Sequence, residues 1–122
     1  KLWPAIAIVP FSTFDDAVIK AKENLLVEGA GHSAALHSNS DDHIKQAGLE
    51  LPISRLVINQ PSSTTAGGSL TNGFAPTTTL GCGSWGGNSI SENLDYKHLM
   101  NVSRIGKIIH DKKVPTDEEI WS

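Results

Sequence analysis

The most distinctive chemistry in this chain lies in the run GCGSWGG at residues 81–87. Glycine permits positive φ angles and close backbone approach, and a tryptophan in such a run is costly to leave exposed. Gly81, Gly83 and Gly86 also match the G-x-G-x-x-G dinucleotide fingerprint, which needs a strand before it and a helix opening within it. Residues 77–80 could be the strand, but no amphipathic helix follows. A small nucleotide-binding domain is therefore only a weak alternative.

Cys82, inside the same run, is the only thiol of the chain. A nucleophilic cysteine is activated by a helix N-terminus or a neighbouring cation. The sequence neighbours of Cys82 are glycine, serine and tryptophan, with no cation among them. We therefore expect Cys82 to be a small packing residue, with a nucleophilic role as the minor alternative.

His32 is the strongest candidate for acid–base chemistry. It follows Gly31 and stands at the start of an apolar run that is predicted to be a parallel strand. A histidine at such a strand end can orient or polarise a substrate oxygen, or it can be a hydrogen-bonded structural residue. These residues alone leave both interpretations open. His37, five residues later, would lie on the opposite face of an extended strand and is given no role.

Composition and spacing exclude several other functions. The histidines and the single cysteine do not occur at metal-ligand spacings, so we expect no metal site. Ten basic residues are spread along the chain and the net charge is −3, which argues against nucleic acid as a partner. No apolar run approaches about 18 residues, so no membrane span is expected. The single cysteine favours a cytoplasmic location.

The first half of the chain alternates between strand and helix patterns. Residues 5–9 form a short apolar run, typical of a strand covered on both faces. Ser12 or Thr13 is expected to cap the next element, and Gly29 to end it. That element is predicted to be a helix because its apolar residues fall on one stripe, formed by Phe14, Ala17, Val18, Ala21 and Leu25.

Two further strands follow that helix. Residues 33–37 and 55–59 are predicted strands, with a short helix between them that Ser40 caps and Gly48 stops. The resulting β-α-β-α-β order predicts a parallel sheet with helices as crossovers. The expected fold class is therefore α/β.

The character of the chain changes after the third predicted strand. Residues 61–69 are polar and glycine-rich, which is typical of a functional loop or of a disordered segment. Asp95 is expected to cap a short helix over residues 95–100. Residues 102–109 alternate imperfectly and are predicted to form a strand, and residues 111–122 a frayed, charged tail in which Ile120 and Trp121 dock.

Four stretches together resemble the C-terminal region of the CoA-acylating aldehyde dehydrogenases, including the aldehyde half of the bifunctional aldehyde-alcohol dehydrogenases. They agree in order and spacing, and the most specific reads LGCGSWGGNSISEN at residues 80–93, with KHL at 97–99. The others are KLWP at residues 1–4 running into FDDAV at 14–18, GHSAALHS at 31–38, and RLVINQP at 55–61. This pattern matches only the last quarter or so of such an enzyme.

The resemblance implies an NAD(P)-dependent enzyme that converts an aldehyde and CoA into an acyl-CoA, through a covalent step on a cysteine upstream of the matching segment. It also implies an active-site role for His32 and a position near the nicotinamide for Leu2. We expect Trp85, Phe74 and Gly83 to contact substrate, with buried packing as an equal alternative for the two aromatic residues. Acetaldehyde, a short dicarboxylic semialdehyde and sulfoacetaldehyde all stay open as the aldehyde.

The expected organisation is the C-terminal part of an aldehyde dehydrogenase catalytic domain at residues 1–100, followed by a terminal assembly strand and tail at residues 101–122. The chain starts at Lys1 without an initiator methionine and is expected to be an excised piece, inactive alone and without tight binding of NAD(P) or CoA. The complete enzyme is expected to be a homo-oligomer. The alternative from another class is a non-catalytic α/β module for oligomerisation or interaction.

Overall fold

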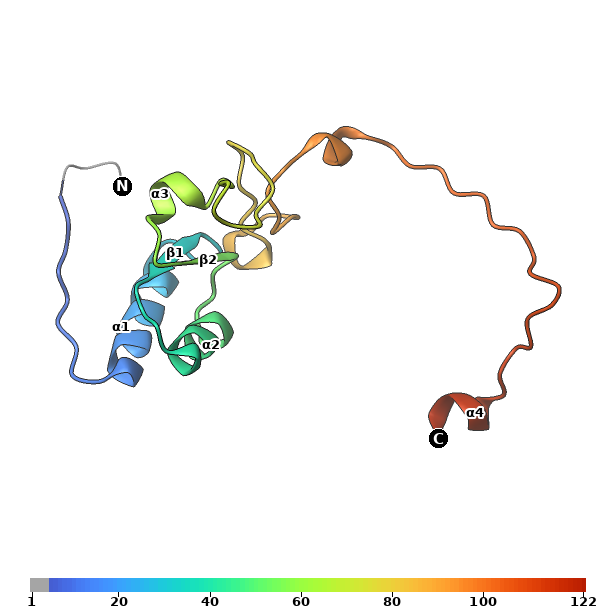
Figure 1. Ribbon diagram of the computed structural model, residues 1–122, viewed down its shortest axis with the longest axis horizontal. Helices are drawn as coiled ribbons and strands as arrows, with labels where there is room; N and C mark the ends of the chain where they lie inside the picture. The colour runs from blue at the N-terminus through green and yellow to red at the C-terminus, as the bar shows by residue number, and fades with distance from the viewer. Residues whose placement is uncertain (1–4) are drawn as a thin grey trace.

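The computed structural model describes residues 5–122 of the chain (Figure 1). Its elements are, in order, α1 (Phe14–Val27), β1 (Ser33–Leu36), α2 (Asp41–Glu50), β2 (Arg55–Ile58), α3 (Ser62–Thr65), the 3₁₀ turns η1 (Ser84–Gly86) and η2 (Tyr96–Leu99), and α4 (Asp117–Trp121). In Figure 1 the first five elements form a compact body, and the chain after η2 leaves it as an extended arm that ends in α4.

Helix α1 begins where the capping pattern predicts. Thr13 is the N-cap, and its side-chain oxygen accepts a hydrogen bond from the Asp16 backbone N–H at 3.2 Å. The Asp16 carboxylate in turn accepts from the Ser12 N–H at 3.0 Å and from Lys20 Nζ at 2.9 Å. These bonds satisfy free backbone donors of the first turn, so the polar residues before the apolar stripe fix where the helix starts.

Strands β1 and β2 lie parallel and side by side, with Ser33 opposite Arg55 and Leu36 opposite Ile58. Helix α2 is the crossover between them, and the Ser40 hydroxyl accepts the His43 N–H at its start, as the sequence predicts. The strands predicted at residues 33–37 and 55–59 are therefore confirmed, and so are the helices predicted before each of them. The expectation that Gly48 stops α2 was wrong, because the helix runs on to Glu50 and ends ahead of Pro52, whose ring disfavours a helical residue before it.

The hydrophobic core lies between the strand pair and the two long helices. Val18 of α1, Ala47 of α2, Leu51 and Ile53 form a buried cluster. The partly buried residues packed against it come from α1 and from both strands, namely Phe14, Ala21, Leu25, Ala34, Leu36 and Leu56. Burying a side chain of the size of valine or leucine stabilises the fold by about 1.5–3 kcal/mol, so this small cluster is what anchors both helices to the strands.

The opposite face of the strand pair is covered by loops. Figure 1 shows α3 and the chain after it on the side of the strands away from α1 and α2. An antiparallel bridge between Leu80 and Asn93 closes the glycine-rich segment into a loop. Within it the run at 81–87 forms the short 3₁₀ turn η1 instead of opening a helix. The dinucleotide fingerprint therefore lacks the helix that it needs.

Two predicted strands are corrected by the structure. Residues 5–9 and residues 102–109 carry no regular secondary structure, and Ile6 and Ile8 are each 88% exposed. An extended segment becomes a strand only when its backbone N–H and C=O groups pair with a neighbour, and neither segment lies against the strand pair. Within residues 5–122 the sheet therefore has two strands, not the expected three.

The C-terminal end differs from expectation as well. Asp95 does cap a short helical turn, η2, as predicted. The tail ends in the short helix α4, capped by Thr116. Ile120 and Trp121 were expected to dock, but Trp121 is 83% exposed. This prediction was wrong.

Candidate functional site

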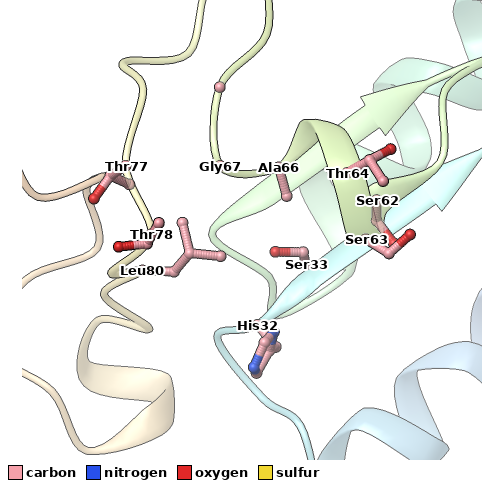
Figure 2. Close-up of a pocket in the computed structure, with 11 residues that line it drawn as sticks. His32, Ser33, Ser62, Ser63, Thr64, Ala66, Gly67, Thr77, Thr78 and Leu80 are labelled. Atoms are coloured by element: carbon pink, nitrogen blue, oxygen red, sulfur yellow. The ribbon is translucent and has the colours of Figure 1, made fainter.

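A hollow of about 590 Å³ opens where β1 begins, between the strand pair and the loops above it (Figure 2). Hydroxyl-bearing side chains and backbone make up most of its wall. Its lining residues are His32, Ser33, Ser62, Ser63, Thr64, Ala66, Gly67, Gly68, Thr77, Thr78 and Leu80. We call it the hydroxyl-lined hollow. It suits a small polar group because its hydroxyls can both donate and accept hydrogen bonds.

His32 lies at the mouth of this hollow and is exposed. Its backbone is fixed on both sides, because its N–H donates to the Gly29 carbonyl at 3.0 Å and its C=O accepts from the Ser54 N–H at 3.0 Å. Gly31, just before it, has a φ of 79° and packs so closely on the Cys82 carbonyl that any Cβ would overlap it. Only glycine fits there. The glycine therefore seats His32 beside the 81–87 run.

Ser33 supplies the floor of the hollow. Its hydroxyl oxygen is buried and has no hydrogen-bond partner among the described residues. In Figure 2 this side chain lies between the α3 wall and the Thr78–Leu80 wall. A buried hydroxyl without a partner is costly, so it is a candidate to bind a ligand atom in the hollow.

The two walls of the hollow are joined by a backbone hydrogen bond. The Thr77 N–H donates to the Gly67 carbonyl at 2.8 Å, and this bond brings the segment before Leu80 against the segment after α3. Residues 61–69, for which the sequence predicts a loop, supply much of one wall, and their functional role stays a prediction. The first of these residues nevertheless form the short helix α3.

The other predicted substrate residues face different hollows. Gly83 and Trp85 line one of about 450 Å³, and Trp85 is 57% exposed. Phe74 lines another of about 240 Å³ beside Arg55. The structure therefore does not bring these residues together with His32. Leu2, expected near the nicotinamide, lies outside the described residues.

Cys82 is half-buried and packs among backbone atoms. Its N–H donates to the Asn88 side-chain oxygen at 3.0 Å, and its side chain lies against Gly86, where an added Cβ would come 2.5 Å from Cys82 Cβ and 3.7 Å from its Sγ. The neighbours given by these contacts are glycine and asparagine. This environment agrees with the expectation of a packing residue.

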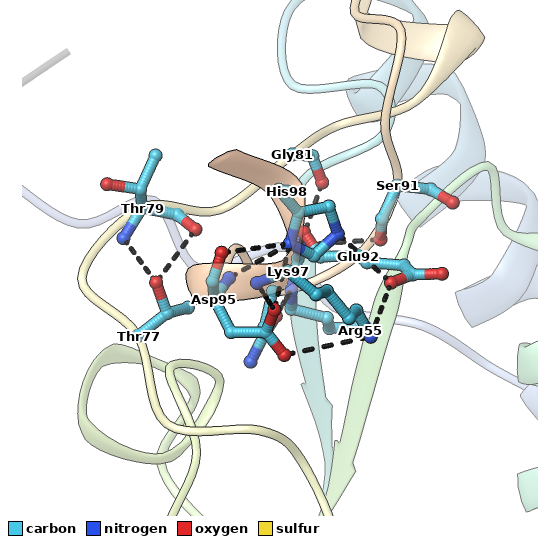
Figure 3. A network of polar contacts seen from close by, with 10 residues as sticks. Arg55, Thr77, Thr79, Gly81, Ser91, Glu92, Asp95, Lys97 and His98 are labelled. Atoms are coloured by element: carbon cyan, nitrogen blue, oxygen red, sulfur yellow. Dashed lines mark hydrogen bonds and ion pairs between the residues drawn. The ribbon is translucent and has the colours of Figure 1, made fainter. Parts of the chain in front are cut away.

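A cluster of ionisable side chains lies beside the glycine-rich loop (Figure 3). Lys97 Nζ lies 3.4 Å from the Glu92 carboxylate and 3.6 Å from that of Asp95. Hydrogen bonding to Lys97 lowers the pKa of Glu92 below its usual value, and the same bond raises the pKa of Lys97. His98 Nδ1 accepts the Asp95 N–H and so completes the cap of η2. All four groups are paired, with Glu92 and Lys97 exposed and Asp95 and His98 partly buried, so we assign them to capping the turn rather than to catalysis.

Residues 5–122 offer neither a metal site nor a membrane span. No group of three or more histidine, cysteine or acidic side chains in that range is placed to hold a metal ion. None of the helices described is long and apolar enough to cross a bilayer.

Comparisons with known proteins identify the family. No protein-family model matches the chain. It is 60% identical over 121 residues to the succinate-semialdehyde dehydrogenase (acetylating) of Clostridium kluyveri, covering 99% of this chain and 26% of that protein. It is 41% identical over 111 residues to the bifunctional aldehyde-alcohol dehydrogenase of Escherichia coli K12, covering 88% of this chain and 12% of that protein. The crystal structure of a probable aldehyde dehydrogenase from Listeria monocytogenes EGD-e matches with a TM-score of 0.75 at 35% identity, over 90% of this chain and 23% of that one.

The chain belongs to the CoA-acylating aldehyde dehydrogenase family. It spans about a quarter, or less, of the length of these relatives. The family resemblance predicted from four sequence stretches is thereby confirmed, and so is its α/β character. The roles given to His32, Trp85, Phe74 and Gly83 stay predictions.

Three residues of the site region were missed from the sequence. Ser33 was seen only as part of a strand, although its place next to His32 and opposite Arg55 puts it on the face that the loops cover. Arg55 was quoted only as part of a predicted strand and of a family stretch, and it is 3% exposed. Asn93 was quoted only as part of the family motif. One sequence feature could have pointed to this network: an arginine at the start of an apolar strand. A charged side chain that is buried with such a strand needs hydrogen-bond partners, and these must come from neighbouring segments.

Proposed function

We propose that this segment is the C-terminal part of the catalytic domain of a CoA-acylating aldehyde dehydrogenase. The reaction would be aldehyde plus CoA plus NAD(P)⁺ giving acyl-CoA plus NAD(P)H plus H⁺. The observation that carries the proposal is 60% identity to an acetylating succinate-semialdehyde dehydrogenase across 99% of this chain. The hydroxyl-lined hollow beside His32 supports it, because it offers a polar pocket at the residue that the family resemblance selects.

Within this reaction His32 would hydrogen-bond the carbonyl oxygen of the aldehyde or of the acyl group on its way to CoA. Hydrogen bonds of the His32 backbone hold this residue in place at the mouth of the hollow. Its imidazole ring is therefore left to bond a substrate oxygen. The Ser33 hydroxyl would bind a polar atom deeper in the hollow. The nucleophile would lie outside this segment, since Cys82 is half-buried and packs on Gly31 and Gly86, with no activating partner in the contacts described.

The described residues differ in how well they suit the two cofactors. The glycine run does not suit a dinucleotide pyrophosphate, because it continues into a single 3₁₀ turn and not into a helix. We therefore derive no step at NAD(P) from this segment. The hydroxyl-lined hollow suits a small polar group such as the thioester end of an acyl-CoA, with His32, Ser33 and Thr78 as the residues that would hold it. When bound, CoA supplies the thiol that takes up the acyl group.

We propose a short dicarboxylic semialdehyde as the aldehyde. The name of the Clostridium kluyveri relative specifies succinate semialdehyde, and hydroxyl donors can hold a terminal carboxylate in the hollow. The test is an assay of the complete protein that carries this segment, with CoA, NAD⁺ or NADP⁺, and either succinate semialdehyde or butyraldehyde. We expect NAD(P)H and succinyl-CoA to form together, with kcat/KM at least about tenfold higher for the semialdehyde, a difference of one charge-assisted hydrogen bond.

Two controls make this test decisive. Omitting CoA should abolish acyl-CoA formation, and the 122-residue chain alone should give no NAD(P)H above blank. Turnover by the chain alone would contradict the proposal that the nucleophile lies elsewhere. Absence of CoA-dependent turnover in the complete protein would favour the non-catalytic α/β module.

A further inference from the structure

Arg55 is the one buried charged residue identified among residues 5–122, and its bonds are unusual. It stands at the start of β2, is 3% exposed, and has no carboxylate partner among the described residues. Burying a guanidinium is costly unless its donors are satisfied; here Nε and Nη2 are bonded, whereas the buried Nη1 has no partner among the described residues. Its partners are instead oxygens of the glycine-rich loop (Figure 3).

Those partners span the whole base of the loop. Arg55 Nη2 donates to the Gly81 carbonyl at 2.8 Å, to the Glu92 carbonyl at 3.1 Å and to the Ser91 carbonyl at 3.4 Å. Its Nε donates to the Asn93 side-chain oxygen at 2.5 Å. One guanidinium thus holds both ends of the loop to the strand.

Asn93 extends the connection to the other loop. Its side-chain nitrogen donates to the Ala66 carbonyl at 3.1 Å and to the Ala75 carbonyl at 2.8 Å. Ala66 lines the hydroxyl-lined hollow, and Leu80, the neighbour of Gly81, lines it on the other side. The Arg55–Asn93 pair therefore ties both walls of the hollow to β2, the strand that pairs with β1, on which the floor residue Ser33 lies.

We propose that Arg55 and Asn93 are positioning residues that set the width of the hydroxyl-lined hollow and hence its affinity for substrate. The inference rests on the proposed function of that hollow. His32 is held separately, through Gly29 and Ser54. We call the Arg55–Asn93 pair and its bonds to the two loops the latch. Loosening the latch should weaken substrate binding more than it slows the chemical step.

The experiment uses the complete enzyme that carries this segment and combines hydrogen exchange with kinetics. In Arg55→Met, amide exchange should accelerate about tenfold or more over residues 61–94, the effect of losing hydrogen bonds to a charged group. Exchange in α1 and α2 should stay within about twofold. KM for the aldehyde should rise about tenfold or more with kcat within a few fold.

Two further variants separate the halves of the latch. Arg55→Lys keeps the charge but not the planar fork, so it should give intermediate exchange and KM values. Asn93→Asp still offers an oxygen to Arg55 but loses the donor to Ala66 and Ala75, and it should free residues 66–77 while residues 81–92 stay protected. This variant also tests the latch if Arg55→Met does not fold. Lys22→Met, at an exposed basic residue of α1, is the control and should change neither exchange over residues 61–94 nor KM.

Two results would overturn the inference. One is unchanged exchange over residues 61–94 in Arg55→Met, and the other is an equal loss of protection in α1 and α2, which would make Arg55 a general fold residue. Loosened loops with an unchanged KM would uphold the latch but reject the hollow as the substrate site. Hydrogen exchange can be measured without turnover. Failure of the latch would therefore appear in the exchange rates, whereas failure of the proposed function would appear only in the kinetics.

Discussion

Two histidines bracket β1, and only one of them lines the hydroxyl-lined hollow. His32 precedes the strand at the mouth of the hollow, whereas His37 follows the strand and is exposed. Both are histidines followed by a serine, and they differ in their position relative to the hollow. His37 is therefore the natural control for any role that is given to His32.

We predict that His32→Ala in the complete enzyme lowers kcat by about 10²-fold, the usual contribution of a positioned acid–base or hydrogen-bonding group. His37→Ala should leave kcat within about twofold, because exposed substitutions away from a site have small effects. Steady-state kinetics with the Tm of each variant measure this. A His32→Ala enzyme with wild-type kcat and kcat/KM for both aldehyde and CoA, but a lower Tm, would return His32 to a structural role.

Cys82 tests whether the chain's only thiol takes part in chemistry. Its sulfur packs against Gly86 in a crowded turn, so Cys82→Ser places a more polar atom in the same space. We predict a loss of about 1 kcal/mol in unfolding free energy, with turnover within a few fold. Denaturant unfolding and initial rates measure the two effects. Complete loss of acyl-enzyme formation in a folded variant would instead identify Cys82 as the nucleophile.

At the scale of the element, α1 carries a charge arrangement that depends on pH. The hydrogen bond from Lys20 Nζ, followed by that from the Ser12 N–H, lowers the pKa of Asp16 below its usual value of 3.8. A carboxyl group whose pKa is lower in the folded state stabilises the fold above its unfolded pKa. That contribution disappears as the pH falls through the folded pKa. The pH window for α1 therefore lies below about pH 4.

We predict that Asp16→Asn lowers the Tm at pH 6 and that this difference from wild type shrinks steadily below about pH 4. The effect should be small because Asp16 is near the surface, where water screens the pair. Circular dichroism melts at several pH values measure it, with Glu23→Gln on the exposed face of α1 as the control. A Tm difference that is constant between pH 2 and pH 6, a range of about two units on either side of the usual carboxyl pKa, would contradict the prediction.

The elements that the sequence predicted correctly are those that carry their own signals. Helix α1 has an apolar stripe and a cap, α2 has a cap, and the apolar runs of β1 and β2 pair with each other. Residues 5–9 have an equally good strand pattern, but no strand of the described chain pairs with them. Periodicity shows which face of a strand is apolar, whereas pairing depends on what lies beside it.

The site was only partly accessible to sequence reasoning for the same reason. His32 could be proposed because it stands out by residue type and by its family motif. The walls of the hollow depend on contacts between residues far apart in the chain, such as the bond from Asn93 to Ala66 and the Leu80–Asn93 bridge. A polar run such as residues 61–69 has no periodicity to predict where it folds back. Its position is set by the partners that it meets.

At the scale of the whole molecule, the extended arm is the feature that the rest of the chain does not explain. Residues 101–109 leave the body without regular structure, and Ile105 and Ile108 are 90% and 80% exposed (Figure 1). An extended backbone with apolar side chains is suited to pair with a free sheet edge. We propose that residues 101–122 form the assembly arm of the complete enzyme, with a second copy of the chain as its partner.

The assembly proposal predicts that Ile105→Ser combined with Ile108→Ser lowers the molar mass of the complete enzyme in solution. Each side chain buried at an interface contributes about 1.5–3 kcal/mol, so losing two should raise the dissociation constant by about 10²-fold or more. Light scattering coupled to gel filtration, over a range of protein concentrations, measures this. Lys107→Ser, between the two positions, is the control and should leave the mass unchanged.

An unaltered mass in the double variant, with melting of the body at a lower temperature, would show that the arm folds back on its own chain. The same double variant should keep the exchange protection of β1 and β2, because their hydrogen bonds lie within the body.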